Sequence, residues 1–408
     1  MHIGKFVYFC KIKFTLNSIA MDDILMDYMR EQLNVTSMTF TRYKYTAIDW
    51  SLRMIGLVGP RGVGKSTLVM QHIKRSGQKA LYTSADRSYF ARHTLTQVAS
   101  DWVKEGGTHL YIDEIHKYPN WSTELKEIYD GHPSLHIVFT GSSVLDLLRG
   151  QADLSRRAVI YTMQGLSFRE YLEMFHGIRL PVCTLADLLG HHIADALLPH
   201  PLPYFRQYLR EGYYPFSQEG AYYSRLDQIV TQTLESDIPQ YASMSVATGR
   251  KLRRLMGIVA QSAPFKPDYS GIANVIGTSR NVLPDYLLYM ERAGMIGQLR
   301  DEAGGLRSLG KVEKVYLDNP NLIYALGADQ SNVGNVRETF FYNQAREVCD
   351  IVASKVSDFV IGEYTFEVGG RGRGAAQLSG LPNAYVVKDD IEYGHGTTIP
   401  LWTFGLLY

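Results

Sequence analysis

The chain has 408 residues, of which 45% are hydrophobic and 20% are charged, and its formal net charge is +1. This composition is typical of a globular protein and excludes a largely disordered chain, while the length predicts two or three domains. A net charge this close to zero does not by itself indicate a partner such as nucleic acid, so any basic binding surface has to be local.

Cysteine usage and hydropathy set the expected location. Cys10, Cys183 and Cys349 are far apart and include no C-x-x-C pair, so they indicate neither a disulfide framework nor a zinc site. Lysines interrupt the apolar runs in residues 1–20, and we interpret this segment as an extension rather than a secretory signal. The sequence contains no apolar stretch of about eighteen residues, so we expect no membrane span. We expect a cytoplasmic protein.

Five short β-rich runs alternate with helical patterns in the first half of the chain. They are Met54–Val58, Lys79–Thr83, Thr108–Asp113, Leu135–Thr140 and Ala158–Met163. Such an alternation predicts the α/β class, with a parallel sheet covered by helices.

A glycine-rich loop follows the first of these runs. Its residues are Gly59, Pro60, Arg61, Gly62, Val63, Gly64, Lys65 and Ser66, which fit G-x-x-x-x-G-K-[ST]. The glycines let backbone N–H groups surround a polyphosphate, and the helix that starts near Thr67 adds its positive end. We expect residues 59–67 to bind ATP, with Lys65 on the β- and γ-phosphates and the Ser66 hydroxyl on Mg²⁺. A turn without chemical function is the alternative, which the flanking strand and helix disfavour.

The third run ends in two carboxylates, Asp113 and Glu114. Ligands bind at the carboxyl ends of strands in such sheets, so we expect Asp113 to hold Mg²⁺, directly or through water, opposite Ser66. Glu114 is then placed to orient or deprotonate the attacking water. Acidic pairs also follow apolar strands by chance, and the phosphate loop upstream favours the catalytic interpretation.

Two further positions are candidates for sensing or stabilising phosphate charge. Ser142, after the fourth run, is the preferred sensor of the γ-phosphate, although a serine here could equally cap the next helix. Arg156 and Arg157 precede the last run, and one of them could act as an arginine finger. Solvated surface arginines are the alternative.

The pattern becomes helical after the last run. Residues 166–248 predict a helical lid rich in aromatic residues and leucine. Residues 249–318 read as helices, a tight turn and a hairpin, which we interpret as a winged helix-turn-helix. Its second and third helices are expected over Tyr269–Ile276 and Ser279–Ala293.

A DNA contact through this region would use four polar side chains. Arg280 and Asn281, at the start of the predicted third helix, could meet base edges, while Arg253 and Arg254 could meet phosphates. Packing against protein is the alternative, and Pro284 limits the regularity of the third helix.

The C-terminal segment resembles a PD-(D/E)XK nuclease framework, in which its acids would be Glu338, Asp358 and Glu367. One acid on a helix and two on strands would converge on a divalent cation that activates water. The framework also needs a lysine two residues beyond the last acid, where this chain has Gly369. Arg371 or Lys388 could move into that place, but a guanidinium does not give up a proton, so we expect a degenerate, noncatalytic domain.

Several segments together carry a wider resemblance. They are GPRGVGKST, LYIDEIHKYPNW, VFTGSS, RRAVIYTMQGLSFREYL, YLREGYYPF, AYVVKDDIEYG and IPLWTFGLLY. The sequence resembles the bacterial and archaeal AAA+ ATPases whose core is followed by a winged helix and a restriction-endonuclease-like domain. In this family an arginine stands just before the apolar run of the last strand, and the resemblance implies that its counterpart here is Arg157. Many family members have glycine before it, where this chain has Arg156, so the choice between the two arginines stays open.

These observations predict five regions: an N-terminal extension (1–40), a P-loop ATPase core (41–165), a helical lid (166–248), a winged helix (249–318) and a degenerate endonuclease-like domain (319–408). The predicted function is Mg²⁺-dependent binding and hydrolysis of ATP, coupled to the winged helix and nuclease-like module, with DNA as one candidate target. A nucleotide-gated DNA- or protein-binding switch with little hydrolysis is the first alternative, and a metal-dependent nuclease is the second. A homo-oligomer is expected if Arg157 acts on a neighbouring subunit.

Overall fold

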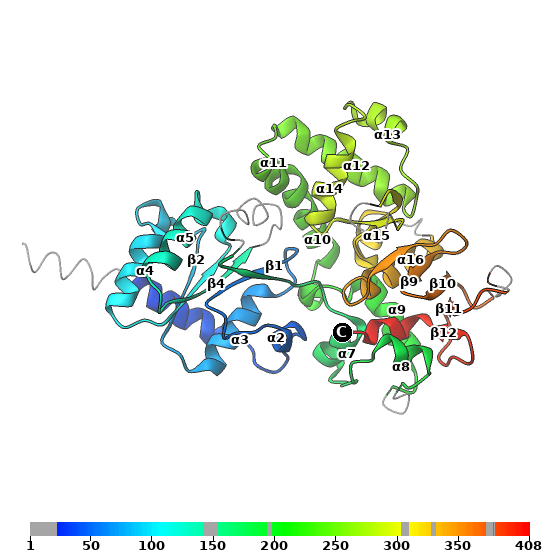
Figure 1. Ribbon diagram of the computed structural model, residues 1–408, viewed down its shortest axis with the longest axis horizontal. Helices are drawn as coiled ribbons and strands as arrows, with labels where there is room; N and C mark the ends of the chain where they lie inside the picture. Colours follow the sequence, from blue (N-terminus) through cyan, green and yellow to red (C-terminus); the bar gives the residue numbers. More distant parts are fainter. Residues whose placement is uncertain are drawn as a thin grey trace, which may run out of the picture. The chain divides into compact units, whose positions relative to one another are not determined.

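The computed structural model describes residues 23–141, 154, 156–193, 198–302, 310–327, 332–372, 378 and 380–408. By its internal contacts the chain divides into two compact units. The first contains Met1–Gly59 and Gly64–Met163, and the second contains Pro60–Val63 and Gln164–Tyr408. Figure 1 shows the helices and strands of both units. No helix within the described ranges has the length and apolar character needed to cross a membrane.

The first unit is built on a five-stranded sheet whose pairings are all parallel. The strands are β1 (Met54–Val58), β2 (Ala80–Ser84), β3 (His109–Asp113), β4 (His136–Gly141) and β5 (Val159–Thr162), in the order β2-β3-β4-β1-β5. Every predicted strand is present, and each boundary lies within one residue of the expected one. The parallel α/β sheet is therefore confirmed.

Apolar content explains why this sheet forms. All residues of β1 and β2 are buried, which is expected of parallel strands that are covered on both faces. The helices of the unit are a segment over residues 23–35, α2 (Lys44–Ala47), α3 (Lys65–Ser76), α4 (Leu95–Lys104) and α5 (Trp121–Gly131). Because all strands are parallel, their carboxyl ends lie along one edge of the sheet.

The second unit begins with helices and ends with a mixed sheet. Its helices are α7 (Phe168–His176), α8 (Leu185–Leu189), α9 (Pro201–Glu211), α10 (Tyr222–Gln232), α11 (Ile238–Tyr241), α12 (Val246–Ser262), α13 (Tyr269–Ile276), α14 (Leu283–Arg292), α15 (Pro320–Leu326) and α16 (Val333–Ala345). An antiparallel hairpin joins β6 (Ile296–Arg300) to β7 (Val312–Leu317). The sheet has the order β12-β11-β10-β9-β8. Its strands are β8 (Ile351–Ala353), β9 (Phe359–Ile361), β10 (Tyr364–Gly369), β11 (Ala384–Lys388) and β12 (Thr398–Pro400).

The helix after the α13 turn starts later than the sequence indicates. The predicted helix Ser279–Ala293 is α14, which begins at Leu283 with proline in its first turn. Proline suits that position because it has no N–H to donate and its φ is already helical. Arg280 and Asn281 therefore lie in the exposed turn before the helix, not on it. The division of this unit into lid, winged helix and nuclease-like domain stays a prediction.

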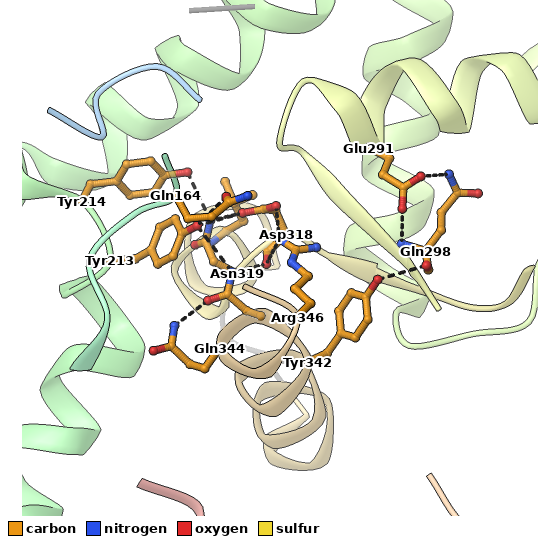
Figure 2. Close-up of polar contacts among 12 residues, drawn as sticks. Gln164, Tyr213, Tyr214, Glu291, Gln298, Asp318, Asn319, Tyr342, Gln344 and Arg346 are labelled. Atoms are coloured by element: carbon orange, nitrogen blue, oxygen red, sulfur yellow. Dashed lines mark hydrogen bonds and ion pairs between the residues drawn. The ribbon is translucent and has the colours of Figure 1, made fainter. Parts of the chain in front are cut away.

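A buried polar network holds the hairpin against α16 (Figure 2). Arg346, the residue that follows α16, forms an ion pair with Asp318, and their side chains are only 13% and 3% exposed. The Asn343 side chain donates a hydrogen bond to the Asp318 carbonyl at 2.9 Å, and the Tyr342 hydroxyl donates to the Gln298 carbonyl on β6 at 3.0 Å. The hairpin is thus fixed by directional bonds as well as by apolar packing.

Arg346→Met should lower the free energy of unfolding by about 3 kcal/mol, because Asp318 keeps its buried charge without a cationic partner. Arg206→Met is the matched control, since Arg206 and Asp390 form a pair whose side chains are 63% and 41% exposed. That pair should contribute less than about 1 kcal/mol. Urea denaturation followed by circular dichroism measures both, and equal losses would contradict a special role for the buried pair.

His72 gives the first unit a pH-dependent stability. Its ring, on α3, stacks on Trp50 with centroids 3.8 Å apart and planes within 8°. Burial lowers the pKa of His72 to about 4, and the nearby His109 and Arg75 act in the same direction. The unfolded chain binds this proton near pH 6.5, so the stability that neutral His72 contributes is lost as pH falls from about 6.5 through 4.

In His72→Asn the free energy of unfolding should fall less steeply between pH 6.5 and 4. The slope against pH should decrease by up to the amount that corresponds to about one proton, because one fewer proton is taken up on unfolding. Denaturant titrations at a series of pH values give this slope. His200→Asn, at a side chain that is 79% exposed, should leave the slope unchanged. An unchanged slope in His72→Asn would show that other groups cause the acid sensitivity.

Candidate nucleotide-binding site

The phosphate-type loop leaves the carboxyl end of β1 and enters α3. Gly59 has a φ of 150°, and a Cβ there would lie 2.1 Å from the Met163 carbonyl oxygen. Gly64, with a φ of 95°, caps the N-terminus of α3 in the left-handed region. Other residue types would be strained at both places. The glycines therefore let the chain turn tightly into the positive end of a 12-residue helix, a position suited to anions.

Lys65 is held inside its own loop. Its side chain is buried, with the residue 5% exposed, and its ammonium donates to the Gly59 carbonyl at 2.9 Å. Ser66 is partly exposed and Thr67 is exposed. A phosphate in the loop would be within reach of a lysine that the protein already keeps over the loop backbone.

Asp113 is fixed at the end of β3 by the two neighbouring strands. The Tyr82 hydroxyl on β2 donates to Asp113 Oδ2 at 2.7 Å, and the Thr140 hydroxyl on β4 donates to Oδ1. Burial and the Asp113 charge raise the pKa of Tyr82 far above its ordinary value, so this hydroxyl keeps its proton and remains a donor. Sequence reasoning missed Tyr82 and Thr140 as partners. Their only sequence signal is that both belong to predicted strands, the one before β3 and the one after it along the chain.

Glu114 follows in a conformation unusual for a residue with a side chain. Its φ is 50°, in the left-handed region, and such residues are enriched at functional sites. Its N–H lies 3.1 Å from Asp113 Oδ1 and 3.3 Å from Thr140 Oγ1, and donates to both. Its carboxylate Oε2 lies 3.2 Å from Nε2 of the buried His116, a contact that sequence reasoning did not predict.

The oxygen donors at this edge fit magnesium. Among the described residues, no group of three or more His, Cys, Asp or Glu side chains could hold a metal. Mg²⁺ does not need such a cage, because it binds through one or two protein oxygens together with phosphate and water. The Ser66 hydroxyl and the Asp113 carboxylate are hard oxygen ligands of this kind.

The structure describes Arg157, a predicted arginine finger, but not Ser142, the predicted sensor of the γ-phosphate. Ser142 lies outside the described residues. Arg157 forms a two-bond pair with Asp130 on α5, with Nε–Oδ1 and Nη2–Oδ2 distances of 3.0 and 2.9 Å. It precedes β5, whereas the loop and Asp113 lie where the strands end, about 15 Å away along a strand. A finger role for Arg157 therefore requires release from Asp130 and a second copy of the chain.

The contacts of Arg61 do not indicate a simple phosphate-binding role. Its guanidinium binds Asp237, with Nε–Oδ2 and Nη2–Oδ1 distances of 2.7 and 3.2 Å, and Asp237 is only 2% exposed. Asp237 ends a π-helical segment, Thr233–Asp237, between α10 and α11. A cavity of about 450 Å³ adjoins this contact, lined in part by Gly62, Phe216 and Ile229. Loop residues 60–63 thus belong by their contacts to the helical unit.

The side chains predicted to contact DNA differ in their contacts and exposure. Arg253 is bonded to Asp227, and the neighbouring Lys251 donates to the Gly277 carbonyl. Arg254, Arg280 and Asn281 are exposed.

Of the three nuclease-like acids, two come together. Glu338 and Asp358 share a contact with Lys314, while Glu367 is buried and accepts a hydrogen bond from Ser357 at 2.6 Å. Sequence reasoning did not find Lys314, because it is 24 and 44 residues from its two partners and belongs to the preceding hairpin.

Two family models match parts of the chain. Residues 51–172 match a family model described as an AAA domain, and residues 202–332 match a domain of unknown function (DUF8612). The uncharacterized protein MJ1637 of Methanocaldococcus jannaschii is 23% identical over 330 residues, which cover 71% of this chain and 69% of that protein. The RuvB Holliday junction branch migration motor of Thermotoga maritima is 15% identical, over 68% of this chain and 91% of that one. Its TM-score of 0.31 is too low to support an argument from structural likeness. The phosphate loop and the five-stranded parallel sheet of the first unit both lie within the range that matches the AAA domain.

Proposed function

We propose that the protein is a magnesium-dependent ATPase whose site lies at the carboxyl edge of the first sheet. The observation that carries the proposal is the placement of Asp113 and Glu114 two strands away from the phosphate loop, with only β4 between. Neighbouring strands are about 4.8 Å apart, so the two strand ends are separated by about 10 Å. That gap suits a terminal phosphate with its hydrated metal.

Each residue has a distinct role in this proposal. Loop amides and the α3 N-terminus bind the phosphates, and the Lys65 ammonium leaves the Gly59 carbonyl to neutralise developing charge. Ser66 and Asp113 would hold Mg²⁺, which would neutralise charge on the phosphate oxygens. Tyr82 and Thr140 keep the Asp113 carboxylate in one orientation.

Glu114 is the base that orients and deprotonates the attacking water. In the structure its carboxylate contacts His116, so the two side chains have to separate, or the second carboxylate oxygen has to act, before water is engaged. Proton transfer of this kind requires the base within about 3 Å of the water.

The second candidate function is a nucleotide-gated binding switch with little hydrolysis. One observation favours it: Arg61, inside the loop, is bound by buried Asp237 of the helical unit. A ligand that reshapes the loop would therefore act on the π-helical segment directly. DNA is one proposed partner of such a switch, through Arg254, Arg280 and Asn281, and assembly with a second copy through Arg157 is another proposal.

Lys65→Ala should weaken binding of Mg²⁺–ATP by 100-fold or more, about 3 kcal/mol, because the loop loses its buried cation. Isothermal titration calorimetry measures the affinity. Lys74→Ala is the control, since Lys74 is an exposed lysine on the same helix and donates a hydrogen bond to the Thr36 carbonyl at 2.8 Å. Equal affinities in all three proteins would place nucleotide elsewhere.

Glu114→Gln should retain ATP affinity within a few-fold but slow phosphate release by about 10²- to 10⁴-fold, because the amide cannot accept the proton from water. Glu127→Gln, on exposed α5 surface, should hydrolyse ATP at the parental rate. Steady-state phosphate release measures both. Parental turnover by Glu114→Gln would remove this carboxylate from the mechanism, and tight binding without turnover in the parental protein would favour the switch.

A further inference from the structure

The acids of the second unit do not form the three-carboxylate metal site that a nuclease framework requires. Glu338 on α16 and Asp358 before β9 approach a common point, but Glu367 on β10 does not join them. Its Oε2 accepts the Ser357 hydroxyl at 2.6 Å, and the residue is 3% exposed. Within the described part of the chain, no group of three His, Cys, Asp or Glu side chains could hold a metal ion here.

A lysine occupies the point where the two carboxylates meet. Lys314 Nζ, from β7, lies 2.9 Å from Glu338 Oε2 and 3.0 Å from Asp358 Oδ1. The three side chains are 30%, 20% and 16% exposed, so the contacts are partly shielded from water. A divalent ion bridging the same oxygens would stand within about 3 to 4 Å of the ammonium and would be repelled by it.

Other protein donors bind the same carboxylates. The Tyr316 hydroxyl, also on β7, donates to Glu338 Oε2 at 3.0 Å. The Val368 N–H donates to Asp358 Oδ2 at 3.0 Å. Burial and Asp358 raise the pKa of Glu338, and Lys314 opposes that shift. Without the lysine, the two acids would repel each other in a poorly solvated place.

We propose that Lys314 is a resident cation that takes the place of the divalent metal, so that the C-terminal acids bind no metal and do not cut phosphodiester bonds. The acid pair instead fastens the β6–β7 hairpin to α16 and to the start of β9. The cation at these two acids is thus supplied by β7 and not by β10, the strand that carries Glu367.

The proposal also predicts that removing the lysine uncovers a metal site. Two carboxylates with water and a tyrosine hydroxyl are sufficient oxygen ligands for Mg²⁺ or Mn²⁺ once the competing charge is gone. This consequence separates a resident cation from an ordinary surface ion pair, whose loss would create no metal affinity.

The test is Mn²⁺ binding followed by electron paramagnetic resonance, without nucleotide and with Asp113→Asn in every protein so that the ATPase site does not contribute. The Lys314 protein should bind no Mn²⁺ with a dissociation constant of about 10⁻⁴ M or tighter. Lys314→Met should gain one such site, and Lys314→Met with Glu338→Gln should lose it. Lys266→Met is the matched control, because Lys266 pairs with one carboxylate among the described residues, Glu313 at 2.6 Å, and this variant should gain no site.

Two outcomes would overturn the proposal. One is stoichiometric Mn²⁺ binding by the Lys314 protein that Glu338→Gln or Asp358→Asn removes, especially if plasmid nicking in Mn²⁺ is lost in the same variants. The other is a folded Lys314→Met protein that gains no site. If circular dichroism shows that Lys314→Met does not fold, Lys314→Gln replaces it, and the measurement on the Lys314 protein decides without any variant at that position.

Discussion

The site depends on one geometric constraint: in a parallel sheet every strand ends at the same edge. The chain uses this edge at β1, β3 and β4, which are adjacent in the order β3-β4-β1. The phosphate loop, the Asp113–Glu114 pair and Thr140 are consequently brought within about two strand spacings of each other. An antiparallel arrangement of the same runs would place alternate strand ends on opposite edges and would separate these groups.

A second layer of interactions turns this closeness into a defined orientation. Asp113 accepts hydrogen bonds from both neighbouring strands. The chain leaves β3 at Glu114, whose backbone is in the left-handed region. Hydrogen bonds to a charged acceptor are stronger than neutral ones, and they restrict the rotamers of the carboxylate. In the proposed mechanism the site is therefore preorganised at Asp113, whereas Glu114 and Lys65 each hold a contact, with His116 and with the Gly59 carbonyl, that would have to break.

Carboxylates of the second unit that are shielded from water are paired with cationic side chains. A buried charge is costly unless it is paired and hydrogen bonded. Asp318 is paired with Arg346, Asp237 with Arg61, and Glu338 and Asp358 with Lys314. In each case the partner comes from a segment far away in the sequence. These pairs tie the loop residues, the hairpin and the C-terminal sheet into one contact unit, and in the last pair the cation is a protein group rather than a metal.

The sequence by itself determined the α/β sheet, its five strands to within one residue, and the phosphate loop. These features depend on local signals: apolar runs, glycine positions and spacing between neighbours. It did not determine Tyr82 and Thr140 as partners of Asp113, His116 as the contact of Glu114, or the late start of α14 at Leu283. Arg61 and Lys314 were decided only by the tertiary structure, because their partners lie 176, 24 and 44 residues away. Pairings at such separations follow from packing of whole elements, and no local pattern encodes them.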